Sequence, residues 1–336
     1  MRMVSQGPPV GPERRGRRGR GTLPSVTAII GGLGAALLWA AATLCSSRSS
    51  RMLGSRVVLG WIMIVGVVVG LPIAVASPAP RTIEPSTLGL LLLAGTCYVV
   101  GLQLTYTALR IGKVSIVAPI VATEGATAAI IAVVLGDRLS VGAAVMLGVI
   151  VLGVVLSTLE PGRTDVAAGD FDLVADAMEA PDDQAAPTPA PAALGDPADT
   201  RRSAILSILA ALIFGVGLFA AGRSASLVPV AWVALTARII GIVAVVIALV
   251  LQGRLRITRA ALPLVVIAGI GEVLGSMLSA WGSRESIPIA AVMGSQFAAF
   301  AAVAAYLLFG ERLGRRQTIG VVVIVAGITA LAAVQV

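Results

Sequence analysis

Apolar residues occur along this chain in ten long runs that are separated by shorter polar connections. Each run has about 20 residues, the length that an α-helix needs to cross the hydrocarbon core of a membrane. The runs are apolar all round, as expected for helices that face lipid and one another. The pattern predicts an all-α membrane protein with ten transmembrane helices, at 25–44, 56–76, 88–109, 114–136, 140–158, 203–221, 229–251, 262–281, 287–309 and 316–335.

Two stretches lack this apolar character, one at the start of the chain and one in the middle. Residues 1–24 are rich in Gly, Pro and Arg, which predicts a disordered basic tail attracted to anionic headgroups. A cleaved signal peptide is an alternative, because a basic stretch precedes an apolar one, but the internal repeat described next argues against cleavage. Residues 159–202 contain ten acidic residues and six prolines, which predicts a disordered acidic linker rich in Pro and Ala.

The sequences on either side of this linker repeat one another weakly. Arg48-Ser49 recurs 175 residues later as Arg223-Ser224. Gly136-Asp137-Arg138-Leu139 recurs 174 residues later as Gly310-Glu311-Arg312-Leu313, between the fourth and fifth helix of each half. Apolar sequence matches easily by chance, so the polar Gly-acid-Arg-Leu pair is the informative observation.

The repeat predicts two five-helix units, at 25–158 and 203–336. An odd number of crossings places the second unit upside down relative to the first. Such inverted repeats are common in transporters, which bind their substrate near the middle of the membrane between the two units.

Composition excludes several classes of protein. The chain is 57% hydrophobic and only 12% charged, whereas soluble domains carry about 25% charged residues. It has no His and two Cys that lie in or beside apolar runs, so neither a metal site nor a disulfide framework is predicted. No P-loop is present, so nucleotide binding is not predicted. Lys113 is the only lysine beside 24 arginines, which together with abundant Ala, Gly and Val indicates a bacterial protein.

Several short motifs resemble the ten-helix EamA family of the drug/metabolite transporter superfamily. They are Tyr106-Thr107-Ala108-Leu109-Arg110-Ile111-Gly112, Ala118-Pro119, Thr236-Ala237-Arg238 and the two Gly-acid-Arg-Leu turns. The resemblance covers roughly residues 26–158 and 203–335. It implies a transporter of small metabolites or drugs, frequently an exporter. The halves depart from one another at Met63, which stands where the second half has Arg238.

The orientation in the membrane is contested by the distribution of charge. The connections that follow odd-numbered helices carry 14 basic residues and those that follow even-numbered helices carry four, which favours termini outside the cytoplasm. The tail adds six basic residues on the side of the even-numbered connections. The net charge of +8 is therefore spread over membrane edges and does not indicate nucleic-acid binding. The tail and the resemblance favour cytoplasmic termini, which we adopt for a multi-pass protein of the bacterial plasma membrane.

Three ionisable residues lie close to the centres of predicted helices: Glu124, Arg238 and Glu272. A charge there costs about 2.5–3.5 kcal/mol on insertion scales, so all three are expected to face the interior, with Arg238 as the partner of one or both glutamates. The glutamates would bind a cationic or amine-bearing group or a coupling proton. The alternative is an internal salt bridge that only fixes helix packing.

Further polar and aromatic residues are predicted to line the same pathway. Glu272, Ser276 and Ser279 follow a helical spacing and form one polar stripe. Pro119 removes a backbone donor five residues before Glu124, which predicts a broken helix near the site. Ordinary packing is the alternative for each of these and for the remaining aromatic and amide side chains, which are Trp39, Tyr98, Gln103, Tyr106 and Gln296.

Two acidic residues at membrane edges receive a structural interpretation. Asp137 and Glu311 each precede an arginine, Arg138 and Arg312, and local ion pairs are expected.

These observations predict a secondary transporter that works by alternating access, is not an enzyme and needs no cofactor. Its expected partners are a small-molecule substrate, the lipid bilayer and, as an open alternative, a coupling proton. The functional alternatives are a membrane scaffold or sensor that does not transport, and a membrane-embedded lipid-modifying enzyme. The oligomeric state stays open between monomer and homodimer, since ten helices can enclose a pathway alone.

Overall fold

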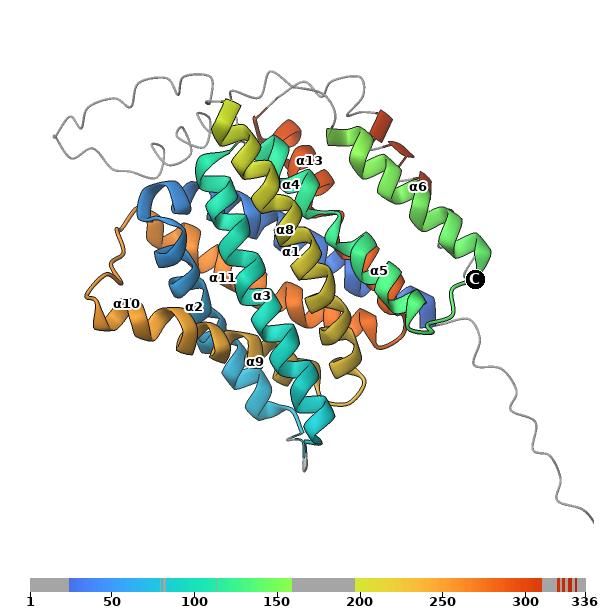
Figure 1. Cartoon of the computed structure of the whole chain (residues 1–336), viewed down its shortest axis with the longest axis horizontal. Helices are drawn as coiled ribbons and strands as arrows, with labels where there is room; N and C mark the ends of the chain where they lie inside the picture. Colours follow the sequence, from blue (N-terminus) through green and yellow to red (C-terminus); the bar gives the residue numbers. More distant parts are fainter. Residues whose placement is uncertain are drawn as a thin grey trace, which may run out of the picture.

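The computed structural model describes residues 24–78, 80, 83–112, 114–158 and 197–309, with single residues and short pieces between 319 and 330. The predicted tail, most of the predicted linker, Glu311 and most of the last predicted helix lie outside these residues. Every regular element in the described part is helical (Figure 1). The helices of the first half are α1 Pro24–Leu53, α2 Ser55–Ala76, α3 Pro85–Ile111, α4 Val114–Val121, α5 Glu124–Val134 and α6 Val141–Thr158.

The second half contains α8 Pro197–Ala225, α9 Val230–Gly241, the π-helical turn η1 Ile242–Val246, α10 Ile247–Leu251, α11 Ala261–Ser283, α12 Ile287–Gly294 and α13 Phe297–Phe309. Helix α8 begins inside the range predicted for the linker. Ser286 is the N-cap of α12, because its hydroxyl accepts a hydrogen bond from the backbone N–H of Ile289. Pro288 lies in the first turn of the helix, where proline is well tolerated.

Six of these helical stretches are long and apolar enough to cross a membrane. They are Val26–Leu53, Ser55–Ala76, Pro85–Ile111, Arg201–Ala225, Val230–Leu251 and Ala261–Ser283. Large apolar side chains also cover the outside of the bundle, such as Val68, Val134 and Leu251, which are 67%, 76% and 82% exposed. Such a surface is unfavourable in water and suits contact with lipid.

The fourth and ninth predicted helices are each interrupted. The first break, at Ala122 and Thr123, comes three residues after Pro119, which itself lies within α4. The second, at Ser295 and Gln296, separates α12 from α13. In each break a hydroxyl donates to a carbonyl three residues earlier: Thr123 to Ile120 at 2.7 Å and Ser295 to Val292 at 2.8 Å. This local bonding competes with the helical hydrogen bonds, so the predicted break is present near Pro119 and has a counterpart that the sequence did not reveal.

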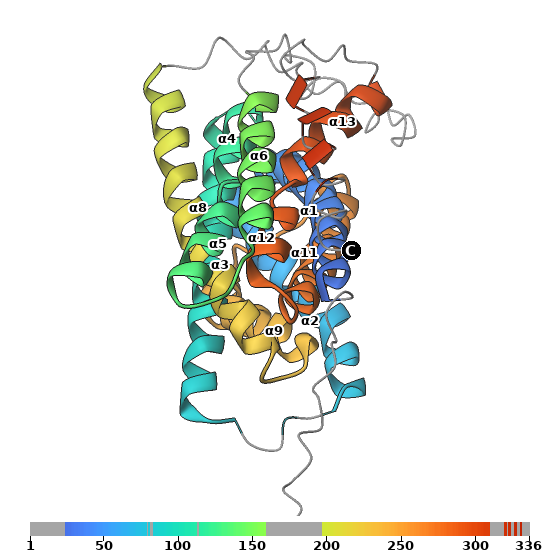
Figure 2. The ribbon, with the colours of Figure 1, turned by 90° about the vertical axis from the view of Figure 1, so that its right-hand side faces the viewer.

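The two halves pack through equivalent helices. Helix α1 packs most extensively against α11, and α3 packs in the same way against α8, while α2 lies against α9 (Figures 1 and 2). Individual contacts between α2 and α9 show the same correspondence between the halves. Gly66 of α2 packs against Arg238 of α9, and Gly241 of α9 packs against Met63 of α2. The residues that the sequence repeat pairs at an offset of 175, Gly66 with Gly241 and Met63 with Arg238, therefore meet crosswise between the halves.

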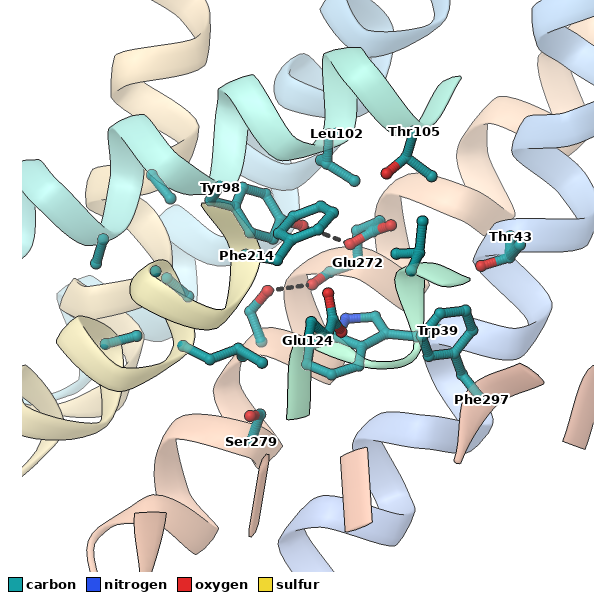
Figure 3. A pocket seen from close by; sticks show the side chains of 18 of the residues that line it. Trp39, Thr43, Tyr98, Leu102, Thr105, Glu124, Phe214, Glu272, Ser279 and Phe297 are labelled. Atoms are coloured by element: carbon teal, nitrogen blue, oxygen red, sulfur yellow. Dashed lines mark hydrogen bonds between the residues drawn. The ribbon is translucent and has the colours of Figure 1, made fainter. Parts of the chain in front are cut away.

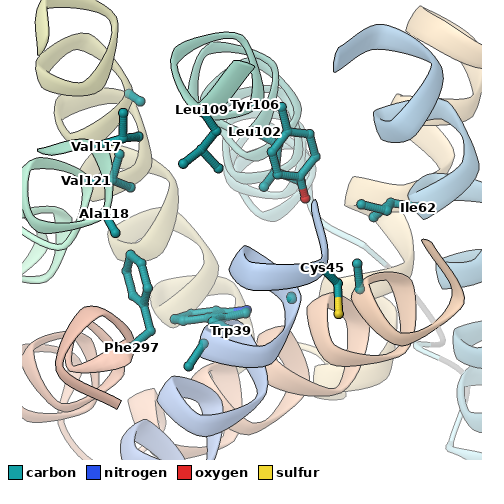
Figure 4. Close-up of a cluster of buried hydrophobic side chains, with 14 of the residues drawn as sticks. Trp39, Cys45, Ile62, Leu102, Tyr106, Leu109, Val117, Ala118, Val121 and Phe297 are labelled. Carbon is teal, nitrogen blue, oxygen red and sulfur yellow. The ribbon is translucent and has the colours of Figure 1, made fainter. Parts of the chain in front are cut away.

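The largest apolar core lies where these helices converge (Figure 4). Helices α1, α2, α3, α4, α8 and α13 contribute to it, with Trp39, Met63, Tyr106, Phe214 and Phe297 among its buried members. The core therefore joins both halves, and it surrounds the cavity described next.

Candidate functional site

A cavity lies inside the bundle, between the two halves of the chain (Figure 3). Its volume is ≈ 90 Å³, which accommodates several water molecules or part of a small molecule. Side chains from α1, α3, α4, α5, α8, α9, α11 and α13 line it. Seven of the predicted pathway residues are among them: Trp39, Tyr98, Tyr106, Glu124, Glu272, Ser276 and Ser279.

Glu272 of α11 is held by two tyrosines of α3, of which Tyr98 is labelled in Figure 3. The Tyr98 hydroxyl donates to Oε2 at 2.5 Å, and the Tyr106 hydroxyl donates to Oε1 at 3.3 Å. The carboxylate is 6% exposed. Hydrogen bonds to a charged acceptor are strong in such surroundings, so the two phenols fix the orientation of this acid from the opposite half of the chain.

Arg238 of α9 is completely buried beside the cavity but does not form the predicted direct ion pair with Glu124 or Glu272. Its guanidinium lies over the ring of Tyr98, 4.3 Å from the centroid, and Nη2 donates to the Ser276 hydroxyl at 3.1 Å. Nε and Nη1 have no hydrogen-bond partner among the described residues. The Tyr98 ring and the Ser276 hydroxyl thus contact the guanidinium in place of a carboxylate.

The position of Arg238 is nevertheless defined by packing and charge. A Cβ atom at Gly66 would lie 2.7 Å from Cδ of Arg238, so only glycine admits this side chain. Ser276 donates in turn to the backbone carbonyl of Glu272 at 2.6 Å. Arg238 is close enough to Glu272 for the two charges to attract one another, which offsets part of the cost of burying both.

Glu124 begins α5, immediately after the break in the fourth predicted helix. It is 5% exposed and forms no hydrogen bond to another described residue, and its carboxyl group faces the cavity (Figure 3). Glu124 is also close enough to Glu272 for the two acids to repel one another electrostatically. The fold therefore brings together two acids that lie in different halves of the sequence.

Two aromatic side chains from equivalent helices line the cavity. Trp39 of α1 and Phe214 of α8 are 175 residues apart. Each packs on a glycine: a Cβ atom would lie 2.7 Å from Trp39 Nε1 if added at Gly275, and 2.7 Å from Phe214 Cδ1 if added at Gly101. The indole N–H of Trp39 is buried against Gly275 and has no acceptor among the described residues.

Two predicted pathway residues, Gln103 and Gln296, lie elsewhere. Gln103 points into a second cleft, where it donates to Ser55 and Thr107. Gln296 is fully buried in the α12–α13 break, and its amide donates to the Val292 carbonyl. Pro119 belongs to α4, whose neighbouring residues Val117, Ala118 and Val121 line the cavity.

The cavity also contains residues that the sequence analysis did not select. Phe214 and Phe297 contribute apolar area, and Thr43, Thr105 and Ser283 contribute hydroxyls. Phe214 was detectable, because the repeat aligns it with Trp39. No sequence signal distinguishes the other four from ordinary packing residues.

Asp137 forms an ion pair with a residue of the other half. The Arg223 guanidinium of α8 donates to its carboxylate at 2.7 Å, and Arg138 does not form the predicted local pair with it. Helix α5 packs directly against α8, which brings Arg223 within reach of the turn that follows α5. Glu311, the equivalent acid, lies outside the described residues.

Within the described ranges, no three Cys, Asp or Glu side chains are grouped as ligands for a metal ion. The cavity offers carboxyl groups, hydroxyls and aromatic rings, with a guanidinium beside it. These groups suit reversible binding of a small polar or charged molecule.

Comparison with known proteins finds a matching family model and solved structures of similar fold. The model of the EamA-like transporter family matches residues 26–159 and 201–333, so both halves fit the same family model. A solved structure described as "Crystal structure of protein" is similar in fold, with a TM-score of 0.63 and 16% sequence identity over 91% of this chain and 96% of that chain. No curated protein matches the chain significantly.

Proposed function

The chain belongs to the EamA-like transporter family, and from this we propose that its central cavity carries a small amine-bearing metabolite or drug across the membrane. Members of the family are multi-pass membrane transporters of small molecules and not enzymes, so a small-molecule substrate and a lipid bilayer are its partners. The matches over 26–159 and 201–333 mean that the chain is built from two EamA repeats. Substrate class, direction and coupling are the parts of the proposal argued below.

The balance of charge in the cavity is the observation that supports an amine. Two carboxyl groups, of Glu124 and Glu272, lie beside one guanidinium, that of Arg238. The charge of Arg238 attracts that of Glu272, whereas the carboxyl group of Glu124 has no hydrogen-bond or ion-pair partner among the described residues. A buried carboxylate requires a compensating charge, and either an ammonium group or a proton supplies it at Glu124.

The walls of the cavity support an aromatic or otherwise apolar body for this substrate. Trp39, Tyr106 and Phe214 present apolar surface between the two acids. Aromatic rings attract cations and stack on other rings.

Transport by this site requires that the cavity open to each side in turn. We propose ten spanning helices arranged as two inverted five-helix repeats that rock against one another within a single chain. The packing of α1 with α11 and of α3 with α8 supports this. In the repeat α1 is equivalent to α8 and α3 to α11, so exchanging the two halves gives the same two pairs of helices. The breaks between α4 and α5 and between α12 and α13 place irregular backbone beside the cavity, as in transporters of this architecture.

We propose export as the direction of transport and a proton gradient as its energy source. An exporter coupled to protons would bind either a proton or the amine at Glu124, so that inward proton flow returns the empty site. The exchange of one for the other at a single carboxyl group is the simplest coupling that the cavity allows. The proposed role is efflux across the bacterial plasma membrane.

A matched series of ligands tests the substrate class. Phenethylamine, 2-phenylethanol and 3-phenylpropionate share an aromatic body and differ in charge. We expect the amine to raise the thermal unfolding temperature of the purified protein and to be transported in proteoliposomes, because a charge-assisted hydrogen bond to Glu124 contributes about 1.5–3 kcal/mol. Equal or stronger stabilisation by 3-phenylpropionate would reject the amine and assign substrate binding to Arg238.

We propose that both termini are cytoplasmic, so that the connection at 159–196 lies outside the cell. Cysteines introduced singly into that connection are then expected to react with a membrane-impermeant maleimide added to intact cells. Reaction only after the cells are opened would reverse the orientation. A buried position such as Ala210, changed to cysteine, controls for nonspecific labelling.

A further inference from the structure

A second cleft lies at the end of the bundle where α2 begins and α3 ends. Its volume is ≈ 330 Å³, and it is separate from the central cavity, with which it shares no lining residue. Ser55 and Arg56 of α2 and Gln103, Thr107 and Arg110 of α3 supply its polar groups. No acidic residue of the described chain lines it.

The floor of the cleft is a connected set of hydrogen bonds. Gln103 Nε2 donates to Ser55 Oγ at 3.2 Å and to Thr107 Oγ1 at 3.0 Å, and the Thr107 hydroxyl donates to the Gln103 carbonyl at 2.6 Å. The proton of Thr107 is thereby used. The Ser55 hydroxyl, 3.3 Å from Thr107 Oγ1, is left to donate to that oxygen or into the cleft. Ser55 itself is buried, at 6% exposure, so the floor is rigid.

The rim of the cleft is positively charged. The guanidinium groups of Arg56 and Arg110 have no hydrogen-bond or ion-pair partner among the described residues. The first backbone N–H groups of α2 point to the same end, and the residue before the helix, Gly54, has no side chain to cap them. Its φ of 87° favours glycine at this turn. Two arginine forks, a hydroxyl and an uncapped helix start are the donors that bind phosphate oxygens.

The position of the cleft in the bundle indicates which kind of phosphate-bearing molecule it binds. Ser55 and Ile111 are the ends of two stretches long enough to span the membrane, so the cleft is at the level of lipid headgroups. One turn further into the span, Val100 of α3 is 41% exposed on the outside of the bundle. A molecule whose phosphate fills the cleft and whose apolar chain runs along α3 satisfies both surfaces.

We propose that this cleft binds the phosphate group of an anionic phospholipid. The assignment accounts for Gln103, Thr107 and Arg110, which the sequence singled out and the central cavity does not use. It is independent of the transported substrate, because none of these residues touches the cavity. The bound lipid would join the start of α2 to the end of α3.

Native mass spectrometry of the purified full chain, titrated with phosphatidylglycerol or phosphatidylcholine, tests the proposal. Tighter binding of phosphatidylglycerol is expected. The double variant Arg56→Gln/Arg110→Gln should weaken it by about 10-fold or more, as two charge-assisted hydrogen bonds are lost. Arg254→Gln/Arg259→Gln removes two exposed charges outside the cleft and should leave the affinity within about twofold, since exposed charges away from the ligand contribute little.

Three outcomes would overturn the assignment. One is equal affinity of the Arg56→Gln/Arg110→Gln variant and the unaltered protein for phosphatidylglycerol. Another is an equal loss in the Arg254→Gln/Arg259→Gln control. The third is binding of millimolar inorganic phosphate that displaces phosphatidylglycerol, which would assign the cleft to a soluble phosphate. Arg56→Lys/Arg110→Lys, which keeps the charge without the fork, should fall between the two double variants and guards against a folding defect.

Discussion

Replacing Glu124 with glutamine is expected to abolish uphill transport while leaving substrate exchange at saturating concentrations. The substitution keeps the size of the side chain and removes the one cavity carboxylate without a bonding partner among the described residues. An amine then loses a charge-assisted hydrogen bond worth about 1.5–3 kcal/mol, which corresponds to roughly 10- to 150-fold in affinity. Proteoliposomes with an imposed pH gradient measure accumulation, and the same vesicles loaded with substrate measure exchange.

Glu272→Gln and Glu285→Gln complete this experiment. Glu272→Gln should also abolish accumulation, and in addition lower the unfolding temperature, because the tyrosine bonds and the charge opposite Arg238 are both altered. Glu285 is exposed in the connection after α11, so its substitution should change neither property. Unchanged accumulation in both the Glu124 and the Glu272 variants would eliminate these acids as carriers of the proton.

Replacing Arg238 with methionine is expected to cause the largest loss of stability among these variants. Methionine is the residue that the first half carries at the equivalent position, Met63, where it packs against Gly241. The new side chain therefore fits beside Gly66, but the change leaves Glu272 without the positive charge that attracts it. Removing one partner of a buried charge pair costs up to about 3–5 kcal/mol. Thermal unfolding in detergent measures the effect.

A double-mutant cycle separates this electrostatic effect from a packing defect. If the loss is electrostatic, Arg238→Met combined with Glu272→Gln is more stable than the sum of the single effects predicts. Additive losses would instead indicate that Arg238 stabilises the protein only by filling space. Arg259→Met, which changes an exposed arginine, is the matched control and should be close to neutral.

Most of the fold was accessible from the sequence, because the free energy of placing a segment in lipid depends mainly on its own composition. The six long apolar helices agree with predicted runs, the turn at Gly54 falls between two such runs, and the turn at Gly136 falls at the end of one. The division of the ninth predicted helix was not accessible. It depends on the Ser295 hydroxyl bonding to its own backbone, and serine makes or avoids that bond according to its surroundings.

The site was accessible in part for the same reason. A charge inside an apolar run must face the interior whatever its neighbours are, and Glu124, Arg238 and Glu272 are all buried. The residues that contact these three charged side chains could not be predicted from the apolar runs. Tyr98 and Ser276 contact the guanidinium in place of a carboxylate, and Gln103 faces the second cleft because of the way α3 is rotated against α2.

The sequence by itself determined that this protein is helical, embedded in a membrane and internally duplicated, and that it has charged residues in its interior. Each of these properties follows from the composition and spacing of residues along the chain. Only the tertiary structure decided which charges meet. Glycines such as Gly66, Gly101 and Gly275 let helices from different halves approach closely, and this sets the rotation and depth of every side chain at the cavity. That register depends on contacts between residues about 175 positions apart, and apolar sequence, which tolerates many alternative packings, does not specify it locally.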